Sequence, residues 1–502
     1  MKKYIITIFT VLFALTSCNL DKAPFSEVAD TEYVKDAKSV NNLVIGAYNG
    51  LYGVLYNEWA MTELRTDNAR MRVNNSTAQD TKLIEELDQL VAGDANAWIQ
   101  DYWDNSYMVV NRANKVLANL DVVDDPTLKA QYEGEARVLR AWMYFNLVRL
   151  WGPVFIVTKK TGADEARQMQ RSPAEDVWAL IEEDLTTVVN GNLLPETMPD
   201  ADLGRIDLVA AKAMLAKVYM TKYRPGDTQY GTASDLLSEV LAARGNPTTG
   251  AALVPYADVF DTSKEMNAEI ILAVRYRSGK LGIGSPFTTL YGPLNNAGNV
   301  AVGSPKHYNF PSDNIISAFD ANPGDKRKDV CLKESYYNKT TGATVDGSNG
   351  RYCNKFIDPD MVSEWDAEND FPIIRLADVM LLKAEALNEL GGPSDEALTL
   401  LNAVRQRAGI PDYTLAELGS IYAFRQAVRE ERRLELAFEN QRFYDLLRWG
   451  TLVSTINEYL ASEPFYGNYN YTVNPISGWQ TLLPIPVSVI NINKTVAQNP
   501  GY

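Results

Sequence analysis

A long buried helix is predicted by residues 128–150, which read LKAQYEGEARVLRAWMYFNLVRL. Apolar side chains with a 3.6-residue period share one face of such a helix; here they are Leu128, Tyr132, Ala136, Leu139, Met143 and Leu147. Trp142, Phe145 and Val148 form a second apolar face, so we expect neighbours on two sides. Gly152-Pro153 then ends the helix.

The same design recurs further along the chain. Ser172-Pro173-Ala174-Glu175 is typical of an N-cap, a first-turn proline and a capping-box glutamate. Asp207 is placed to cap a helix over residues 208–222, whose alanines allow close packing, and a further helix is predicted over residues 233–243.

A second group of helices is predicted near the C-terminus. Residues 374–390 form one helix that stops at Gly391-Gly392-Pro393, and Ser394 opens another that reaches residue 408. Helix pairs of this length are the unit of tetratricopeptide-like repeats. We therefore predict a mainly α fold, a tetratricopeptide-like scaffold of helical pairs over residues 36–245 and 371–460.

The helical pattern fades between residues 255 and 370. Gly, Pro, Asn, Asp and Ser interrupt this segment, and residues 270–276 have the composition of a strand. Long irregular segments usually carry function, because loops present polar groups without burying backbone. We expect a loop-rich insertion with short β-hairpins that contributes to ligand recognition.

The first residues predict export. Lys2 and Lys3 precede an apolar run, residues 4–15, that is too short to span a bilayer. The run ends in Leu15-Thr16-Ser17-Cys18, which resembles the lipobox of bacterial lipoproteins. We predict a signal peptide over residues 1–17, a lipidated Cys18 and one domain over residues 18–502. The alternative is an ordinary secretory signal with a stray cysteine.

Charge and composition exclude several functions. The formal net charge is −16, and removing Lys2 and Lys3 with the signal leaves 46 basic against 64 acidic residues, or −18. Such a chain repels nucleic acid. The chain has a single histidine, His307, which argues against a histidine-rich metal site.

Two cysteines remain after Cys18 is assigned to the lipid. Cys331 and Cys353 lie in strand-like segments, residues 330–337 and 351–357, on either side of a turn-rich stretch. In an exported chain this pattern favours a disulfide that clamps a hairpin. Two free buried thiols are the alternative.

Two clusters of carboxylates invite a chemical interpretation. A glycoside hydrolase would use Glu435 and Glu439 as its acid–base pair, but residues four apart on one helix seldom flank a substrate. Neighbouring arginines in residues 429–448 would keep both ionised, so a structural ion-pair latch on one helix is favoured. The acidic residues of the stretch 358–370 offer ligands for calcium, although EF-hand spacing is missing and a solvated loop is the simpler interpretation.

The chain resembles the SusD/RagB family of outer-membrane lipoproteins. The resemblance rests on motifs whose order and spacing span nearly the whole chain; they are residues 135–145, 147–153, 204–205, 308–311, 354–356, 371–378, 384–386, 404–409, 429–439, 483–486 and 498–502.

The resemblance implies a lipid-anchored protein at the surface of the outer membrane that binds a glycan without catalysis. It also implies a partner, a TonB-dependent SusC-like transporter, and no cofactor. The expected ligand site lies between the early helices and the irregular segment, where its candidate residues are Asp67, Asn68, Arg70, Trp98, Tyr291 and Trp365. A glycoside hydrolase and a helical-repeat receptor for proteins or peptides are the alternatives.

Overall fold

The long central helix forms as the periodicity predicts. In the computed structural model α7 spans Pro126–Trp151, and the carboxylate of Asp125 accepts hydrogen bonds from the backbone N–H groups of Thr127 and Leu128 at 2.8 and 3.1 Å. Gly152, with φ of 71°, ends the helix. The structure describes residues 34–71, 78–247, 253–294, 303–347, 350–463 and 474–502. The predicted signal peptide, residues 1–17, and the predicted lipidation site Cys18 lie outside these residues.

Helices dominate the first half of the described chain. They are α3 (Ala37–Asn49), α4 (Leu51–Met61), α5 (Gln79–Asp88), α6 (Ala97–Leu117), α7, α8 (Ala163–Ala166), α9 (Ala174–Gly191), α10 (Leu208–Lys222) and α11 (Thr228–Arg244). A second group follows residue 375: α15 (Leu376–Gly391), α16 (Asp395–Ala408), α17 (Ile421–Glu435), α18 (Arg442–Arg448), α19 (Leu452–Ser462) and α21 (Val487–Ile492).

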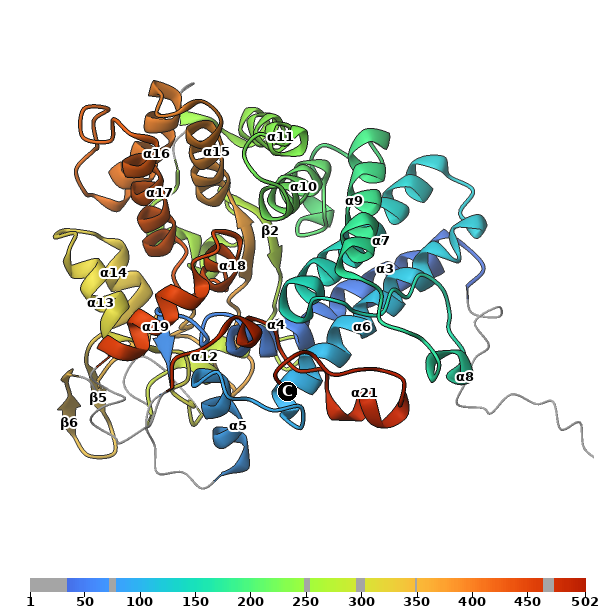
Figure 1. Cartoon of the computed structure of the whole chain (residues 1–502), viewed down its shortest axis with the longest axis horizontal. Coiled ribbons are helices and arrows are strands. Elements are labelled where there is room, and N and C mark those ends of the chain that lie inside the picture. The colour runs from blue at the N-terminus through green and yellow to red at the C-terminus, as the bar shows by residue number, and fades with distance from the viewer. Residues whose placement is uncertain (1–33, 72–77, 248–252, 295–302, 348–349, 464–473) are drawn as a thin grey trace, which may run out of the picture.

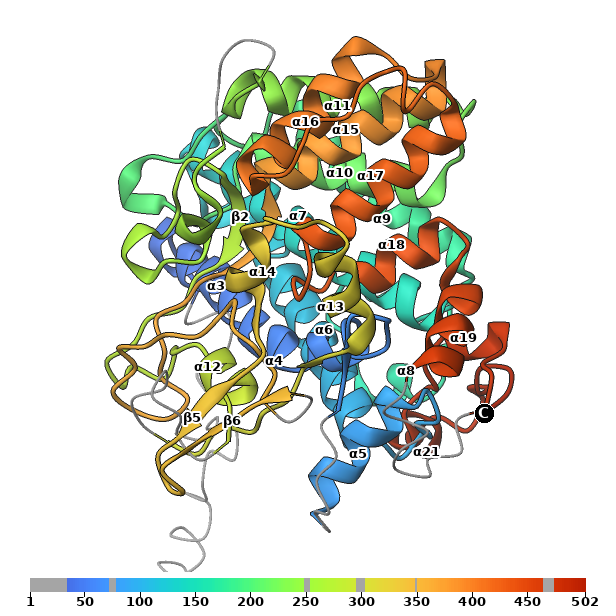
Figure 2. The same cartoon turned by 90° about the vertical axis from the view of Figure 1, so that its left-hand side faces the viewer.

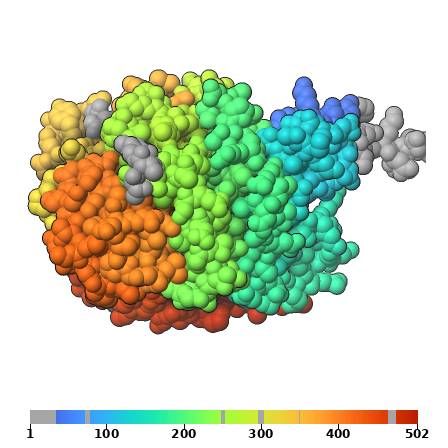
Figure 3. Space-filling view, turned by 90° about the horizontal axis from the view of Figure 1, so that it is seen from above, coloured from blue at the N-terminus to red at the C-terminus, as the bar shows by residue number. Residues whose placement is uncertain are grey.

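The two groups of helices form one continuous array. Helix α6 packs on α7, α7 on α9, α9 on α10 and α10 on α11. Helix α11 then contacts α15, which packs on α16 and α17, although more than a hundred residues separate the two groups. Figure 1 shows these helices following one another across the molecule in chain order, and in the space-filling view of Figure 3 the colours run in the same order, from cyan through green to orange. The predicted tetratricopeptide-like scaffold is confirmed.

The predicted helix caps are partly confirmed. Asp207 accepts a hydrogen bond from the backbone N–H of Ala210 at 2.8 Å, and the Ser394 hydroxyl accepts one from Ala397 at 3.2 Å. The prediction that Ser172 is an N-cap is wrong. Pro173 occupies the cap position of α9, and the backbone N–H of Ser172 instead donates to the carbonyl of Val154 at 2.8 Å.

Short elements punctuate the irregular segment. They are β2 (Ile270–Val274), α12 (Phe287–Tyr291), β3 (Phe310–Pro311), α13 (Asp313–Asp320), α14 (Arg327–Cys331), β4 (Leu332–Lys333), β5 (Tyr336–Asn338), β6 (Ala343–Val345) and β7 (Tyr352–Cys353). Strand β2 pairs antiparallel with β8 (Phe371–Arg375), so the helix predicted from residue 374 begins only at Leu376. Strands β4 and β7 pair, as do β5 and β6, and β3 pairs with β1 (Ala69–Arg70).

The predicted disulfide is wrong. Cys331 and Cys353 are both buried and both carry free thiols. Cys353 lies opposite Leu332 in the β4–β7 pair, while Cys331 is the last residue of α14 and its Sγ lies 3.2 Å from the hydroxyl of Tyr256. The strand register therefore brings Leu332, and not Cys331, opposite Cys353. The alternative of two free buried thiols is confirmed.

Polar residues of the α7 motif tie the scaffold together. Arg140 and Arg137 place Nη2 and Nη1 at 2.7 and 2.8 Å from the same carboxylate oxygen of Asp184 on α9. Glu135 pairs with Arg205 Nη2 at 2.7 Å and accepts a hydrogen bond from Tyr48 at 2.7 Å. These buried contacts join α7 to α3, α9 and the loop before α10.

A buried ion-pair network joins the irregular segment to the C-terminal helices. It has as many cations as carboxylates; its members are Glu269, Asp325, Arg327, Lys355, Arg375, Arg405, Arg407, Glu431, Glu435 and Glu439. Glu435 lies at its centre, 3.1 Å from Arg327 Nη1 and also paired with Arg375 and Arg407.

The ion-pair latch predicted on one helix over residues 429–448 is wrong in its geometry. Helix α17 ends at Glu435 and α18 begins at Arg442, because the backbone turns at Phe438 and Asn440, which have φ of 65° and 60°. Within residues 429–448, Asp445 pairs with Arg448 at 2.9 Å and with Arg432 at 3.0 Å. Arg433 and Glu439 instead pair with Asp67 and Arg375, on distant segments.

Carboxylates of the acidic stretch 358–370 accept hydrogen bonds from backbone N–H groups. Asp366 accepts from the N–H groups of Gly279 and Lys280, Glu368 from Ser278 and Asp370 from Tyr276, at 2.7–3.0 Å. Within the described residues no group of acidic, cysteine or histidine side chains converges as a metal site would require.

None of the helices in the described part of the chain is both long and apolar enough to cross a bilayer.

Candidate functional site

Helix α4 presents aromatic side chains toward the irregular segment. Tyr52 and Tyr56 are four residues apart, so they share one helix face, and both remain half-buried. Trp59 lies behind them in the core and its Nε1–H donates to the carbonyl of Tyr56 at 3.0 Å. Its ring packs edge-on against Tyr291 at 5.9 Å between centroids.

Trp98 lies beside Tyr56 at the start of α6. Asn96 caps this helix by accepting from the backbone N–H of Trp98 at 3.1 Å. The indole Nε1–H donates to the exposed Asp80 carboxylate at 2.7 Å, which fixes the plane of the ring. The Trp98 and Tyr56 rings are stacked, 5.6 Å between centroids and 11° between planes.

Trp365 reaches the same place from the irregular segment. It has a φ of 64°, and its backbone N–H donates to the Thr289 hydroxyl at 3.0 Å. Its ring lies 6.2 Å from the Tyr56 ring, and the ammonium of the exposed Lys306 lies 5.6 Å from its centre. We call Tyr56, Trp98 and Trp365 the aromatic platform. Trp98 is only 4% exposed, whereas Trp365 is 37% exposed.

Charged groups of both signs border the aromatic platform. Burial raises the pKa of Tyr56, and the nearby carboxylates of Asp80 and Asp101 raise it further. Lys306 supplies a cation on the Trp365 side. Flat rings bordered by ionic hydrogen-bonding groups can stack on the C–H face of a sugar while the polar groups bind its hydroxyls.

The structure therefore brings two of the predicted ligand residues together. Trp98 and Trp365 are 267 positions apart in the sequence and both lie against Tyr56. Tyr56 was not predicted, because a tyrosine at helical spacing resembles a core residue. The pairing of Tyr52 with Tyr56, next to Trp59, is the sequence signal that could have marked this face. That Trp98 and Trp365 bind ligand stays a prediction.

Asp67, Asn68 and Arg70 serve the scaffold, contrary to the prediction that they bind ligand. All three are buried. Asp67 accepts hydrogen bonds from Arg442 at 2.8 Å and pairs with Arg433 at 3.1 Å; burial opposes ionisation, but these guanidiniums hold the pKa of Asp67 below its usual value.

Asn68 and Arg70 also contact buried groups of the protein. The Asn68 amide donates to Glu63 at 2.9 Å, and Arg70 lies 3.5 Å from Glu463 and 4.5 Å above the Phe310 ring. Tyr291 is fully buried behind the aromatic platform and contacts Trp59, so it supports the platform from within.

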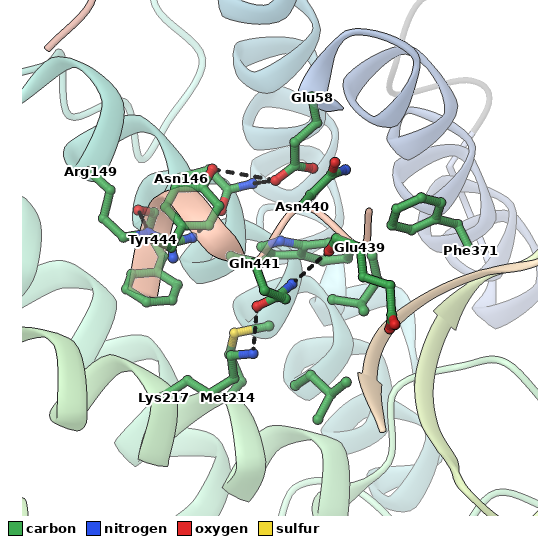
Figure 4. A pocket seen from close by; sticks show the side chains of 14 residues that line it. Glu58, Asn146, Arg149, Met214, Lys217, Phe371, Glu439, Asn440, Gln441 and Tyr444 are labelled. Carbon is green, nitrogen blue, oxygen red and sulfur yellow. Dashed lines mark hydrogen bonds between the residues drawn. The ribbon is translucent and has the colours of Figure 1, made fainter. Parts of the chain in front are cut away.

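A small cavity lies behind the aromatic face of α4. Its volume is about 30 Å³, enough for about two water molecules. Glu58 of α4 and Asn440 point into it, and Lys217, Glu439 and Tyr444 lie around it (Figure 4). Neither amide atom of Asn440 has a hydrogen-bond partner among the described residues. Charged and amide side chains line the cavity together with apolar ones, which suits bound water better than an apolar ligand.

Glu58 makes stability depend on pH. Burial raises its pKa from 4.5 to about 7, although Arg149 opposes the shift. Between pH 4.5 and 7 the folded protein keeps a proton that the unfolded chain releases, so stability falls as pH rises. We expect Glu58→Gln to be more stable than the unmodified protein at pH 8 by roughly 3 kcal/mol, with a much smaller difference at pH 5. Urea unfolding at both pH values measures this.

The exposed Glu196 provides a matched control, because Glu196→Gln should leave the unfolding midpoint unchanged at either pH. A Glu58→Gln variant that differs from the unmodified protein equally at pH 5 and pH 8 would contradict the prediction.

Two family models match the chain. The SusD family model matches residues 308–502, and the model described as starch-binding associating with outer membrane matches residues 19–220. A SusD-like protein, P25, of Formosa agariphila is 26% identical over 99% of both chains. The starch-binding protein SusD of Bacteroides thetaiotaomicron is 24% identical over 76% of this chain and 74% of its own.

Solved structures share the fold. A SusD homolog from Bacteroides thetaiotaomicron superposes with a TM-score of 0.81 at 22% identity, over 95% of this chain and 99% of that one. A laminarin-binding SusD-like protein superposes with a TM-score of 0.77 at 24% identity, over 93% of this chain and all of that one.

Proposed function

Because the chain belongs to the SusD/RagB family, we propose that it binds a glycan at the aromatic platform and delivers it to a TonB-dependent outer-membrane transporter. The observation that carries the proposal is the convergence of Tyr56, Trp98 and Trp365 at one surface site. Relatives whose names refer to starch and laminarin support a glycan as the ligand class.

The aromatic platform suits capture of a sugar chain. The exposed Trp365 ring offers a face for a sugar ring, while the hydrogen bond from Trp98 to Asp80 keeps the neighbouring ring in place. Preorganised rings lose little conformational entropy when a ligand binds. The net charge of −16 disfavours polyanions at long range, so we propose a neutral glycan for this site.

The carboxylates of the hydrolase alternative are poorly suited to catalysis. Glu435 and Glu439 are buried and paired with Arg375, and Glu439 also pairs with Lys355. A general acid needs a raised pKa, whereas the arginines around Glu435 lower its pKa against the effect of burial. This supports a binding protein without catalytic residues.

A lipid anchor at Cys18 would complete the mechanism. Acyl chains buried in the membrane hold a protein at its surface. A tether raises the local concentration of captured glycan near a transporter, which compensates for weak individual contacts. We therefore place the protein in the outer membrane, at the cell surface, beside its SusC-like partner.

The proposal predicts capture without turnover. In native gels that contain laminarin, starch or other polysaccharides, the purified protein should migrate more slowly with at least one of them. The same polysaccharide incubated with the protein should release no reducing ends. Lipidated protein isolated from detergent-solubilised membranes should carry a TonB-dependent receptor with it.

The outcomes separate the alternatives. Release of reducing ends by the purified protein would favour a hydrolase. Failure to be slowed by any polysaccharide, together with binding to peptides, would favour a helical-repeat receptor. If the lipidated protein is isolated without a TonB-dependent receptor, delivery to a transporter is contradicted, whereas glycan binding is not.

A further inference from the structure

A groove lies in the helical scaffold, far from the aromatic platform. Its volume is about 470 Å³, and α10, α11, α15 and α17 contribute to its walls together with Arg448 at the end of α18 and the two residues that follow it. In Figures 1 and 2 these helices lie toward the top of the molecule, whereas α5 and α12, next to the platform, lie toward the bottom. The two sites cannot share one small ligand.

Arginine is concentrated in this groove. The charged residues that line it are Arg224, Arg425, Arg429, Arg448, Glu385 and Glu389, four cations against two carboxylates. This excess of positive charge is local, because the chain as a whole has a net charge of −16. The groove is therefore a place where an anion is attracted to an otherwise acidic protein.

Both carboxylates of the groove are already occupied. Arg448 binds Glu385 through two hydrogen bonds, of 2.5 and 2.7 Å. Arg425 binds Glu389 in the same two-pronged way, at 2.5 and 2.6 Å. Each pair matches a guanidinium fork to a carboxylate and leaves neither group free to neutralise a further cation.

Arg429 and Arg224 have no carboxylate partner within the described residues. The Arg429 guanidinium lies 4.6 Å from the ring centre of Trp449, and its buried Nε atom has no hydrogen-bond partner. Arg224 is exposed at the rim, where its Nη1 reaches only backbone carbonyls at 3.5 Å. Both guanidiniums can donate hydrogen bonds to the carboxylate of a ligand.

The rest of the wall is apolar and sized for a small molecule. Met220, Tyr223, Pro225 and Tyr230 line the groove beside the arginines. Pockets of a few hundred Å³ with apolar walls and a few converging polar groups are typical of small-molecule sites.

We propose that this groove is a binding site for a small organic carboxylate. Arg429 contacts the carboxylate from within the groove and Arg224 from the rim, while the tyrosine rings contact the body of the ligand. The inference stands apart from glycan capture at the aromatic platform, because it uses none of the same residues.

Calorimetric titration of the purified protein with sodium glucuronate tests this site, with glucose as the neutral sugar of similar shape and sodium benzoate as an acid without hydroxyl groups. We expect a dissociation constant on the order of 1 mM for at least one acid and binding of glucose at least about tenfold weaker. Arg429→Gln should weaken binding of that acid at least about tenfold, and the exposed variant Arg224→Gln should weaken it by about threefold or more.

Controls isolate the groove. Arg167→Gln removes an exposed arginine of the loop after α8, whose partner is Asp164, and should leave binding unchanged. Trp365→Ala, at the platform, should also leave it unchanged. Absence of binding by both acids, equal binding of glucose and glucuronate, or full binding by both arginine variants would overturn the proposal. Thermal unfolding of each variant verifies that the fold is intact, and Arg224→Gln keeps the test valid if Arg429→Gln is unstable.

Discussion

Glu435→Gln is expected to lower the free energy of unfolding by about 3–5 kcal/mol, the usual effect of removing one partner from a buried ion pair. Glu435 is fully buried and pairs with Arg327, Arg375 and Arg407. Burial alone raises its pKa, but these guanidiniums outweigh burial and lower it. The variant leaves the buried network with one carboxylate too few. Urea unfolding followed by tryptophan fluorescence measures the loss.

Glu430→Gln is the matched control, because Glu430 belongs to the same helix and is exposed. Its substitution should change the free energy of unfolding by less than about 0.5 kcal/mol. Equal effects of the two substitutions would show that the network does not hold the irregular segment against the helices.

Trp365→Ala is expected to weaken glycan binding at least about thirtyfold, which corresponds to the 2 kcal/mol or more typical of a dominant tryptophan contact. Trp365 is the exposed member of the aromatic platform, and its removal leaves Tyr56 and Trp98 without their third ring. Affinity electrophoresis and calorimetry with the polysaccharide that retards the unmodified protein measure the effect. The free energy of unfolding should change little, because Trp365 is not a core residue.

Trp479→Ala tests whether the effect belongs to the platform. Trp479 is 38% exposed, almost the same as Trp365, but packs against Tyr502 near the C-terminus. Its loss should leave glycan binding intact. If both tryptophan variants bind as tightly as the unmodified protein, the ligand site lies elsewhere.

The helices could be predicted because their signals are local. The period of residues 128–150, the cap at Asp207 and the cap at Ser394 act within a few residues of themselves, and each produced the expected helix. The sequence-based predictions were wrong where a segment distant in the sequence offered the same residues another hydrogen-bond partner. Residues 374 and 375 became part of β8 because β2 pairs with them, and Ser172 bonded Val154 in place of capping α9.

The motifs of the chain were sufficient to identify its family and mainly helical scaffold, because apolar period and cap chemistry are written in neighbouring residues. Tertiary packing alone assigned the roles of charged and aromatic side chains. Asn68 accepts a hydrogen bond from Arg433, 365 residues away, and so became internal rather than ligand-facing. Tyr56, by contrast, was left half-buried between Trp98 and Trp365. A side chain's partners depend on which surfaces meet, and that is settled only when the whole chain has folded.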